Sequence, residues 1–484
     1  MPDKPRRRPN LLFLYTDEQR ADTLAAYGNH KIETPNLNAL AERSTVFERA
    51  YVSQPVCTPS RSTLLTGLTP HTNGCTTNNV PLPEDVKCLP EMIDDEYVCA
   101  HHGKWHLGDE IYTQHGFDEW RAIEDMYMPH YSEKRDRNDR SHYHHWLVSK
   151  GHTPNMDDGR FNRNYCTRLP EELSKPAYLA GEASRFIEEN KDAPFALYVN
   201  FLEPHMPFNS CRDSQYDRSY VDLPPNFGDT VHWSLREKLG AARWAKQYEN
   251  EAAWRDLIAR YWGLCSLVDT HVGRILDTLS QCGLDDDTII VYTSDHGDMM
   301  GSHKLLTKGV MLEEAVRVPF MVSLPGQKDG RRVANPVSQT DVVPTLLELM
   351  GADAPGNLEG QSLVPALDGT EPERDVVIEW NGSAGLGALE NPKVFEHLKH
   401  IASIDEARAA VADPVRTIVT PDNWKLCISP LGEHRMFDLN TDPYETRDVL
   451  AGPGNATRAG DMLARLTEWQ SRTRDEVSLP GALH

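Results

Sequence analysis

The sequence predicts an α/β fold in which helices flank a large, mostly parallel sheet, with a smaller C-terminal antiparallel sheet as a second subdomain. Two observations predict the large sheet: apolar runs of strand length recur along the chain, and segments with helical periodicity lie between them. In the C-terminal part, by contrast, short β-like runs follow one another directly. We therefore expect a main α/β domain over residues 1–385 and an α+β subdomain over residues 386–484.

Three apolar runs are the predicted central strands. Asn10–Tyr15 is unbroken, as expected for a strand buried on both faces, and Phe195–Phe201 and Thr288–Tyr292 have the same character. A helix is predicted to begin at Pro35, since proline is favoured at the first helical position. Asp256–Leu279 repeats apolar residues at helical spacing. Strands and helices thus alternate as a parallel sheet requires.

Polar residues follow each of these strands. Asp17 comes after the first strand, His205 after the second, and Asp295 and His296 after the third. Open α/β sheets bind their ligands at the carboxyl ends of the strands. We therefore expect these four side chains to lie close together, although they are far apart in the sequence.

The remaining segments divide into an insertion and a C-terminal sheet. Residues 126–170 are rich in Tyr, His, Arg and Asp without clear periodicity, so we expect an insertion or lid. Short β-like runs follow at Val415–Val419, Trp424–Ile428 and Arg435–Leu439, and a helical stretch at Ala459–Arg472. These runs predict a small antiparallel sheet with one helix.

Composition excludes several classes of protein. The 484 residues include 50 Lys plus Arg and 73 Asp plus Glu, a formal charge of −23, which argues against binding to nucleic acid or to an anionic membrane. No apolar run reaches the roughly 18 residues of a membrane span. The nine cysteines include no C-x-x-C pair, so neither a disulfide framework nor a zinc site is expected. We expect a soluble, cytoplasmic protein.

The segment from Cys57 to Gly67, CTPSRSTLLTG, is the most informative. Thr58 and Pro59 predict a helix start and Gly67 its end, so Cys57 lies at a helix N-terminus, where free N–H groups and the dipole favour an anion. On these grounds Cys57 is either a thiolate nucleophile of low pKa or a small buried residue at the helix start.

This segment resembles the C-x-P-x-R…T-G signature of the sulfatase family, within the alkaline phosphatase superfamily. The resemblance implies that a formylglycine-generating enzyme oxidises Cys57 to formylglycine, an aldehyde that is hydrated to a gem-diol. Arg61 would then hold residue 57 in place. It also implies an alkaline-phosphatase-like α/β fold, whose catalytic domain would be residues 1–385.

Other segments resemble the same family in the same order along the chain. GKWHLG at 103–108 implies that Lys104 binds the sulfate and that His106 is the partner of the formylglycine hydroxyl. FLEPHMP at 201–207 places His205 toward the leaving group. The segment from Ser294 to Phe320 supplies Lys308 as a second sulfate-binding cation.

A metal site is implied by the same resemblance. One divalent cation, most plausibly Ca²⁺ with Mn²⁺ or Mg²⁺ as alternatives, would be bound by an oxygen-rich set of ligands. The expected ligands are Asp17, residue 57 (Cys57 in the sequence), Asp295 and His296. Glu18 and Asn78 are further candidates for binding the metal or the substrate.

The function that these motifs predict is the hydrolysis of sulfate monoesters resembling aryl sulfates. A phosphonate monoester or phosphodiester hydrolase of the same superfamily is the alternative, since Glu18 stands where many sulfatases have a second aspartate and His296 where part of the family has asparagine. A non-catalytic anion-binding protein is a third hypothesis, if Cys57 stays a thiol. The resemblance also implies a small-molecule substrate and a homo-oligomer, either a dimer or a tetramer.

Overall fold

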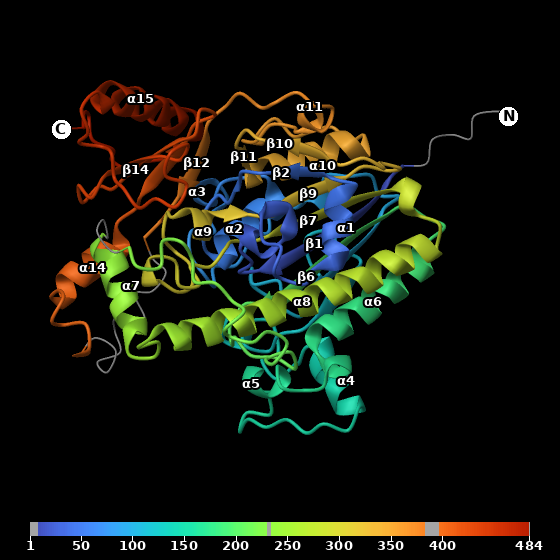
Figure 1. Cartoon of the computed structure of the whole chain (residues 1–484). Helices are drawn as coiled ribbons and strands as arrows, with labels where there is room; N and C mark the ends of the chain where they lie inside the picture. The colour runs from blue at the N-terminus through green and yellow to red at the C-terminus, as the bar shows by residue number, and fades with distance from the viewer. Residues whose placement is uncertain (1–7, 230–233, 383–395, 484) are drawn as a thin grey trace.

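An eight-stranded sheet forms the centre of the computed structural model, which describes residues 8–229, 234–382 and 396–483 (Figure 1). Five neighbouring strands, β7-β1-β6-β4-β5, run parallel, whereas β9 is antiparallel to both β7 and β2. The predicted mostly parallel sheet is therefore confirmed. In sheet order the strands are β10 (Arg331–Val333), β2 (Thr45–Phe47), β9 (Phe320–Ser323), β7 (Thr288–Ser294), β1 (Asn10–Asp17), β6 (Phe195–Pro204), β4 (Val98–Gly103) and β5 (Glu119–Ala122).

Strand β1 is buried on both faces, as its apolar run predicts. Leu11 and Phe13 pack in the core that α2 and α10 cover, and Leu12 and Leu14 pack in the core on the opposite face. Helices α1, α6 and α8 cover that opposite face, where α6 and the long α8 lie side by side (Figure 1). Their bounds are α1 (Pro35–Glu42), α2 (Cys57–Thr66), α6 (Lys175–Asn190), α8 (Glu251–Gln281) and α10 (Val342–Met350).

The C-terminal sheet is antiparallel and carries one long helix, as predicted. Strands β12 to β15 pair in sequence order, and α15 packs on them through Met462, Leu463 and Leu466. The sheet starts earlier than residue 386, however, because β12 pairs with β13 along its whole length. The bounds are β12 (Val376–Glu379), β13 (Arg416–Val419), β14 (Trp424–Ile428), β15 (Arg435–Asp438) and α15 (Asn455–Thr473).

Residues 126–170 contain two short helices, α4 (His142–Ser149) and α5 (Arg163–Cys166), which lie beyond α6 in Figure 1. They have too few turns to produce a readable periodicity. Both helices have an N-cap side chain. Ser141 accepts a hydrogen bond from the N–H of His144, and Asn162 accepts one from the N–H of Asn164. The predicted insertion is therefore partly helical.

Short elements complete the fold. Strands β11, β3 and β8 form a three-stranded sheet, and α7 packs against α14 through Leu239 and Ala407. No helix in the described part of the chain is both long and apolar enough to cross a bilayer. The bounds are β3 (Ala50–Tyr51), β8 (Arg317–Val318), β11 (Val337–Ser338), α3 (Pro70–Asn73), α7 (Leu235–Ala245), α9 (Glu313–Val316), α11 (Val364–Leu367) and α14 (Ile404–Ala412).

A buried ion cluster joins the C-terminal sheet to the rest of the molecule. The ammonium of Lys425, on β14, lies 3.1 Å from a carboxylate oxygen of Glu313 at the start of α9 and 2.8 Å from one of Glu445. All three side chains are buried. Burial raises the pKa of Glu445 to about 7 although Lys425 lowers it. Lys425 therefore compensates two desolvated carboxyl groups, and Arg317, 3.7 Å from Glu313, is a second cation beside one of them.

Replacing Lys425 by Met should lower the free energy of unfolding by about 3–5 kcal/mol, because it leaves Glu445 buried without its ion pair and Glu313 with only the more distant Arg317. Thermal and urea denaturation measure the loss. The control is Lys399→Met, which removes an exposed pair with Glu396 and should change the free energy by less than about 0.5 kcal/mol. Equal effects of the two substitutions would contradict this account of the cluster.

Candidate active site

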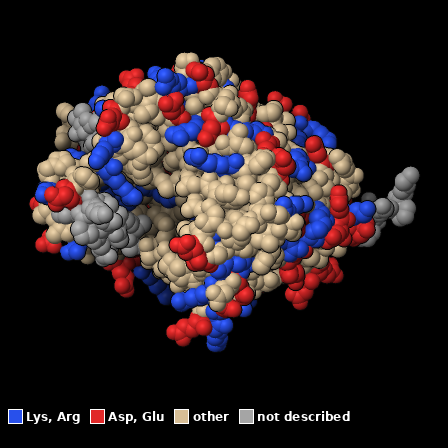
Figure 2. Space-filling view, turned by 90° about the horizontal axis from the view of Figure 1, so that it is seen from below, with Lys and Arg blue, Asp and Glu red and all other residues tan. Residues whose placement is uncertain are grey.

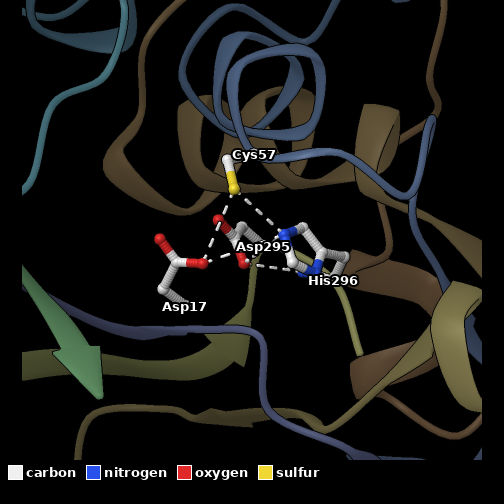
Figure 3. A group of neighbouring side chains, drawn as sticks. All are labelled: Asp17, Cys57, Asp295 and His296. Atoms are coloured by element: carbon white, nitrogen blue, oxygen red, sulfur yellow. Dashed lines mark hydrogen bonds and ion pairs between the residues drawn. The ribbon is translucent and has the colours of Figure 1, made fainter. Parts of the chain in front are cut away.

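The ends of β1 and β7 meet the start of α2, and together they form a compact cluster of potential ligands. Single ligand atoms of Asp17, Cys57, Asp295 and His296 all lie within 4.8 Å of one another (Figure 3). Cys57 Sγ is 3.2 Å from His296 Nε2 and 3.7 Å from Asp17 Oδ1. The structure thus brings together all four residues that the sequence suggests as metal ligands.

Helix α2 begins at Cys57 and ends before Gly67, whose φ of 72° is left-handed. The side-chain oxygen of Asn78 accepts the N–H of Thr58 at 3.0 Å, so Asn78 binds the free end of the helix next to residue 57. Burial and the charge of Asp17 raise the pKa of the Cys57 thiol, but Lys104, Lys308 and His296 outweigh them, and the net shift is downward. Position 57 therefore favours negative charge.

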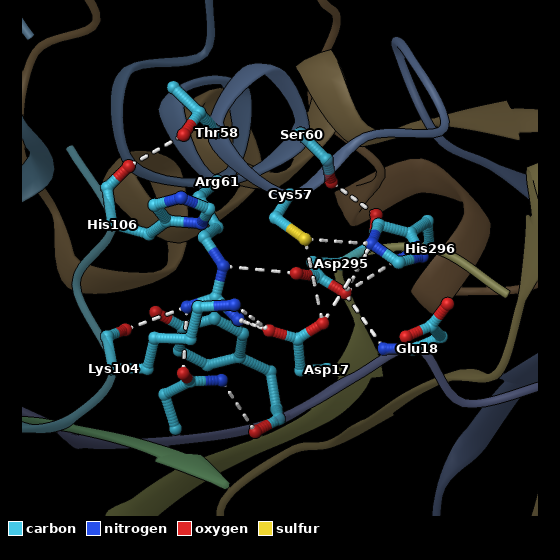
Figure 4. A network of polar contacts seen from close by, with 12 residues as sticks. Asp17, Glu18, Cys57, Thr58, Ser60, Arg61, Lys104, His106, Asp295 and His296 are labelled. Atoms are coloured by element: carbon cyan, nitrogen blue, oxygen red, sulfur yellow. Dashed lines mark hydrogen bonds and ion pairs between the residues drawn. The ribbon is translucent and has the colours of Figure 1, made fainter. Parts of the chain in front are cut away.

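Each of the two carboxylates of the cluster has one oxygen that contacts Arg61 and one that lies near His296. Oδ2 of Asp17 accepts a hydrogen bond from Arg61 at 2.8 Å, and Oδ2 of Asp295 accepts one at 2.9 Å. The Oδ1 atoms face His296 Nε2, at 3.8 Å for Asp17 and 3.6 Å for Asp295 (Figure 4). Arg61 thereby orients one oxygen of each carboxylate toward the centre of the cluster.

Arg61 itself is completely buried and makes two further hydrogen bonds. It donates to the carbonyl of Lys104 at 2.6 Å and to Oδ1 of Asn200 at 2.7 Å. We expected Arg61 to hold residue 57, but within the described chain its hydrogen bonds reach Asp17, Asp295, Asn200 and Lys104 instead. Its effect on position 57 is therefore indirect and passes through the carboxylates.

Lys104 and Lys308 approach the cluster from different elements. The ammonium of Lys104 donates to Oδ2 of Asp17, and that of Lys308 donates to Oε2 of Glu18 at 3.0 Å. Lys308 is part-buried and Lys104 completely so. Lys104 thus lies against a carboxylate of the cluster and Lys308 against Glu18 beside it, and a bound cation would release part of their charge toward a substrate.

Glu18 lies beside the cluster in a strained backbone conformation. Its φ is 72°, which is uncommon for a residue with a side chain, and Oε2 lies 3.4 Å from His205 Nε2. Oε1 is buried and has no hydrogen-bond partner among the described residues. Burial raises the pKa of Glu18 to about 8 although Lys308 lowers it. Asp17, Glu18 and His205 form a second group of neighbouring ligand atoms.

His106 is held in a fixed orientation. Its Nε2 lies 3.0 Å from Oδ1 of Asn79, and its ring lies 4.1 Å, centre to centre, from that of Tyr127. Its backbone φ is 60°, and its carbonyl accepts the hydroxyl of Thr58 at 2.7 Å. Burial, with the charges of Lys104 and Arg61, holds the pKa of His106 well below its usual value. A neutral imidazole results, which can accept a proton.

Three residues of the site were not expected from the sequence. Asn200 could have been recognised in the sequence, because it is a polar residue inside the apolar run of β6. Asn79 and Tyr127 could not, because each acts through a contact with His106 that only the folded chain creates.

The donor set fits a hard divalent cation. Carboxylate oxygens and one imidazole nitrogen are ligands that Ca²⁺, Mg²⁺ or Mn²⁺ accept, whereas a soft metal prefers several thiolates. The unpartnered buried Oε1 of Glu18 adds an oxygen that no protein donor satisfies within the described residues. Asp17, Asp295, His296 and residue 57 are thus the residues that would hold such an ion, with Glu18 beside them.

Comparison with known proteins identifies the family of this chain. The sulfatase family model matches residues 9–352. An ulvan-active sulfatase of Formosa agariphila is 27% identical over 98% of this chain and 83% of its own length, and an arylsulfatase of Clostridium perfringens is 28% identical over 92% and 90%.

Solved structures of related proteins share the fold. The phosphonate monoester hydrolase of Silicibacter pomeroyi superposes with a TM-score of 0.77 at 23% identity, over 97% of this chain and 96% of that one. That of Agrobacterium radiobacter gives 0.74 at 24% identity, over 96% of each chain. With the family model matched over most of its length, this chain belongs to the sulfatase family of sulfuric ester hydrolases, within the alkaline phosphatase superfamily.

Proposed function

We propose that this protein hydrolyses sulfate monoesters of the aryl sulfate type, with formylglycine derived from Cys57 and one divalent cation. The observation that carries the proposal is the position of Cys57. It lies at the first turn of α2, in contact with Asp17 and His296, while Lys104 and Lys308 approach the same cluster. A negatively charged ester needs cations beside its sulfur before a nucleophile can approach.

Calcium is the cation that the chemistry of the donor set favours. Asp17, Asp295, His296 and residue 57 would hold it. Ca²⁺ accepts carboxylate and other oxygen ligands in flexible geometry, which makes it our first candidate. Mn²⁺ stays the second candidate because of the His296 nitrogen. The bound ion would act as a Lewis acid toward the sulfate oxygens.

The side chains around residue 57 divide the remaining work. Residue 57 in the form of hydrated formylglycine would supply one hydroxyl as nucleophile, and loss of a proton from its second hydroxyl would release sulfate and restore the aldehyde without attack of water on sulfur. His106, held neutral, accepts that proton. We assign to His205 the proton that the departing oxygen of the ester takes up, although burial and the charge of Lys308 hold the pKa of His205 well below its usual value. Lys104 and Lys308 offset the charge of the sulfate.

The domain bounds, the maturation, the localisation and the oligomeric state of the protein stay predictions from the sequence. We expect the catalytic domain to be residues 1–385, a formylglycine-generating enzyme to mature the chain, and the protein to act in the cytoplasm. We also expect a homo-oligomer, either a dimer or a tetramer.

A phosphonate monoester or phosphodiester hydrolase is the second candidate, favoured by Glu18 and His296. Lys104 and His106 favour sulfate esters instead. The calcium-loaded enzyme should therefore hydrolyse 4-nitrophenyl sulfate with a kcat/KM at least about tenfold higher than that for 4-nitrophenyl phenylphosphonate, or about 1.4 kcal/mol of transition-state stabilisation. Steady-state kinetics on the same preparation measure both. A preference for the phosphonate would favour the second candidate.

Replacing His205 by Gln should slow esters with poor leaving groups far more than esters with good ones. An alkyl or phenyl leaving group depends on a proton from His205, so kcat/KM should fall about 100- to 10,000-fold for phenyl sulfate and much less for 4-nitrophenyl sulfate. The control is His130→Gln, which changes an exposed histidine. Equal losses on both substrates would show that His205 does not protonate the leaving group.

A further inference from the structure

A cavity of about 220 Å³ opens beside the candidate active site. Val56, Asn78 and Lys308, which lie near residue 57 or in the candidate site, line it together with residues of α7 and with Trp380. The face of the molecule seen from below is hollowed, with Lys and Arg side chains near the hollow (Figure 2). Helix α7 contributes two cationic side chains and one aromatic side chain to the cavity: Arg236, Arg243 and Trp244. A second aromatic residue, Trp380, directly follows β12.

Arg236 is the unusual residue of this cavity. Its guanidinium lies over the ring of Trp380, with Cζ 3.2 Å from the ring centre. Its Nη1 atom is buried and has no hydrogen-bond partner among the described residues. Buried guanidinium groups normally donate to carboxylates or carbonyls, because leaving a charged donor unpaired is costly. The arginine is therefore held in place without an acceptor.

The two acidic residues that act electrostatically on Arg236, Glu237 and Asp413, have other hydrogen-bond partners. Both oxygens of Glu237 accept hydrogen bonds from Arg435, at 2.7 and 2.8 Å. Asp413 accepts the hydroxyl of Ser429 and the N–H of Leu431. Neither carboxylate is hydrogen-bonded to Arg236 in the described structure. None of the described residues accepts a hydrogen bond from Nη1 of Arg236, so this atom is available to a bound group, and the charge of the arginine favours an anion.

Arg236 lies close to the segment of the chain that contains Lys308. A Cβ atom placed on Gly309 would lie 2.7 Å from Nη2 of Arg236 and 3.3 Å from the ring of Trp380. Gly309 directly follows Lys308 in the chain, so the guanidinium lies against the segment that presents Lys308. A group bound by Arg236 is therefore close to an ester sulfate beside Lys308.

We propose that Arg236 binds a second anionic group of the substrate, a carboxylate or a second sulfate carried on the same aromatic or sugar ring as the ester. Trp244, which is part-exposed, provides an apolar ring face in the same cavity against which such a ring can stack, whereas the buried Trp380 supports the guanidinium of Arg236. The proposal rests on the proposed sulfatase function and names the class of substrate, a sulfate ester with a further negative charge.

Paired substrates test this site. 3-Carboxyphenyl sulfate and its uncharged match, 3-carbamoylphenyl sulfate, differ only in the charge of the second group. The wild-type enzyme should favour the carboxylate by about tenfold or more in kcat/KM, and Arg236→Met should remove that preference. Lys238→Met, a change of an exposed cation on the same helix, should leave the preference intact. Benzene-1,3-disulfate tests whether a second sulfate serves as well.

Two results would overturn the proposal. One is a wild-type enzyme without preference for either charged substrate. The other is an equal loss on charged and uncharged substrates in Arg236→Met, which would show a structural role. A preference for the disulfate that Arg236→Met removes would support the site and identify sulfate as the second group.

A binding measurement separates this proposal from the proposed reaction. If the formylglycine-bearing enzyme hydrolyses no aryl sulfate, the proposed function is wrong, and titration calorimetry with the Cys57→Ala protein still tests Arg236. 3-Carboxyphenyl sulfate should bind the Cys57→Ala protein at least about tenfold more tightly than the Cys57→Ala, Arg236→Met protein. Equal dissociation constants would overturn the site.

Discussion

The buried guanidinium of Arg61 is the interaction on which the rest of the site depends. From helix α2 it reaches Asp17 at the end of β1, Asp295 after β7, Asn200 in β6 and the carbonyl of Lys104 after β4. Four strand ends can meet one side chain only because parallel strands end at the same edge of a sheet. The same contacts leave one oxygen of each carboxylate directed toward residue 57, so the fold and the ligand geometry are set together.

Charge explains how an acidic protein can hold an anion. The candidate site contains three cations, Arg61, Lys104 and Lys308. It also contains three carboxyl groups, those of Asp17, Glu18 and Asp295. Without a metal the formal charges of these six groups cancel. A divalent ion would give the site a net positive charge suited to one sulfate. The formal charge of −23 belongs to the rest of the chain, and the basic residues of the site are each paired with an acid.

The sequence predicted the parts of the fold in which local pattern and burial agree. The runs at β1, β6 and β7 are apolar because both faces are covered, and the polar residues after them meet at one edge. Strand β12 and helices α4 and α5 were not predicted, since short elements are fixed by their partners rather than by periodicity. Contacts such as Tyr127 with His106 exist only in the folded chain.

Mass spectrometry of the tryptic peptide from Ala50 to Arg61, in a preparation that hydrolyses an aryl sulfate, tests the account most directly. The account predicts that residue 57 carries an aldehyde in place of its thiol in that peptide, and that the modified fraction rises and falls with activity between preparations. An active preparation in which every copy of the peptide contains unmodified Cys57 would contradict it.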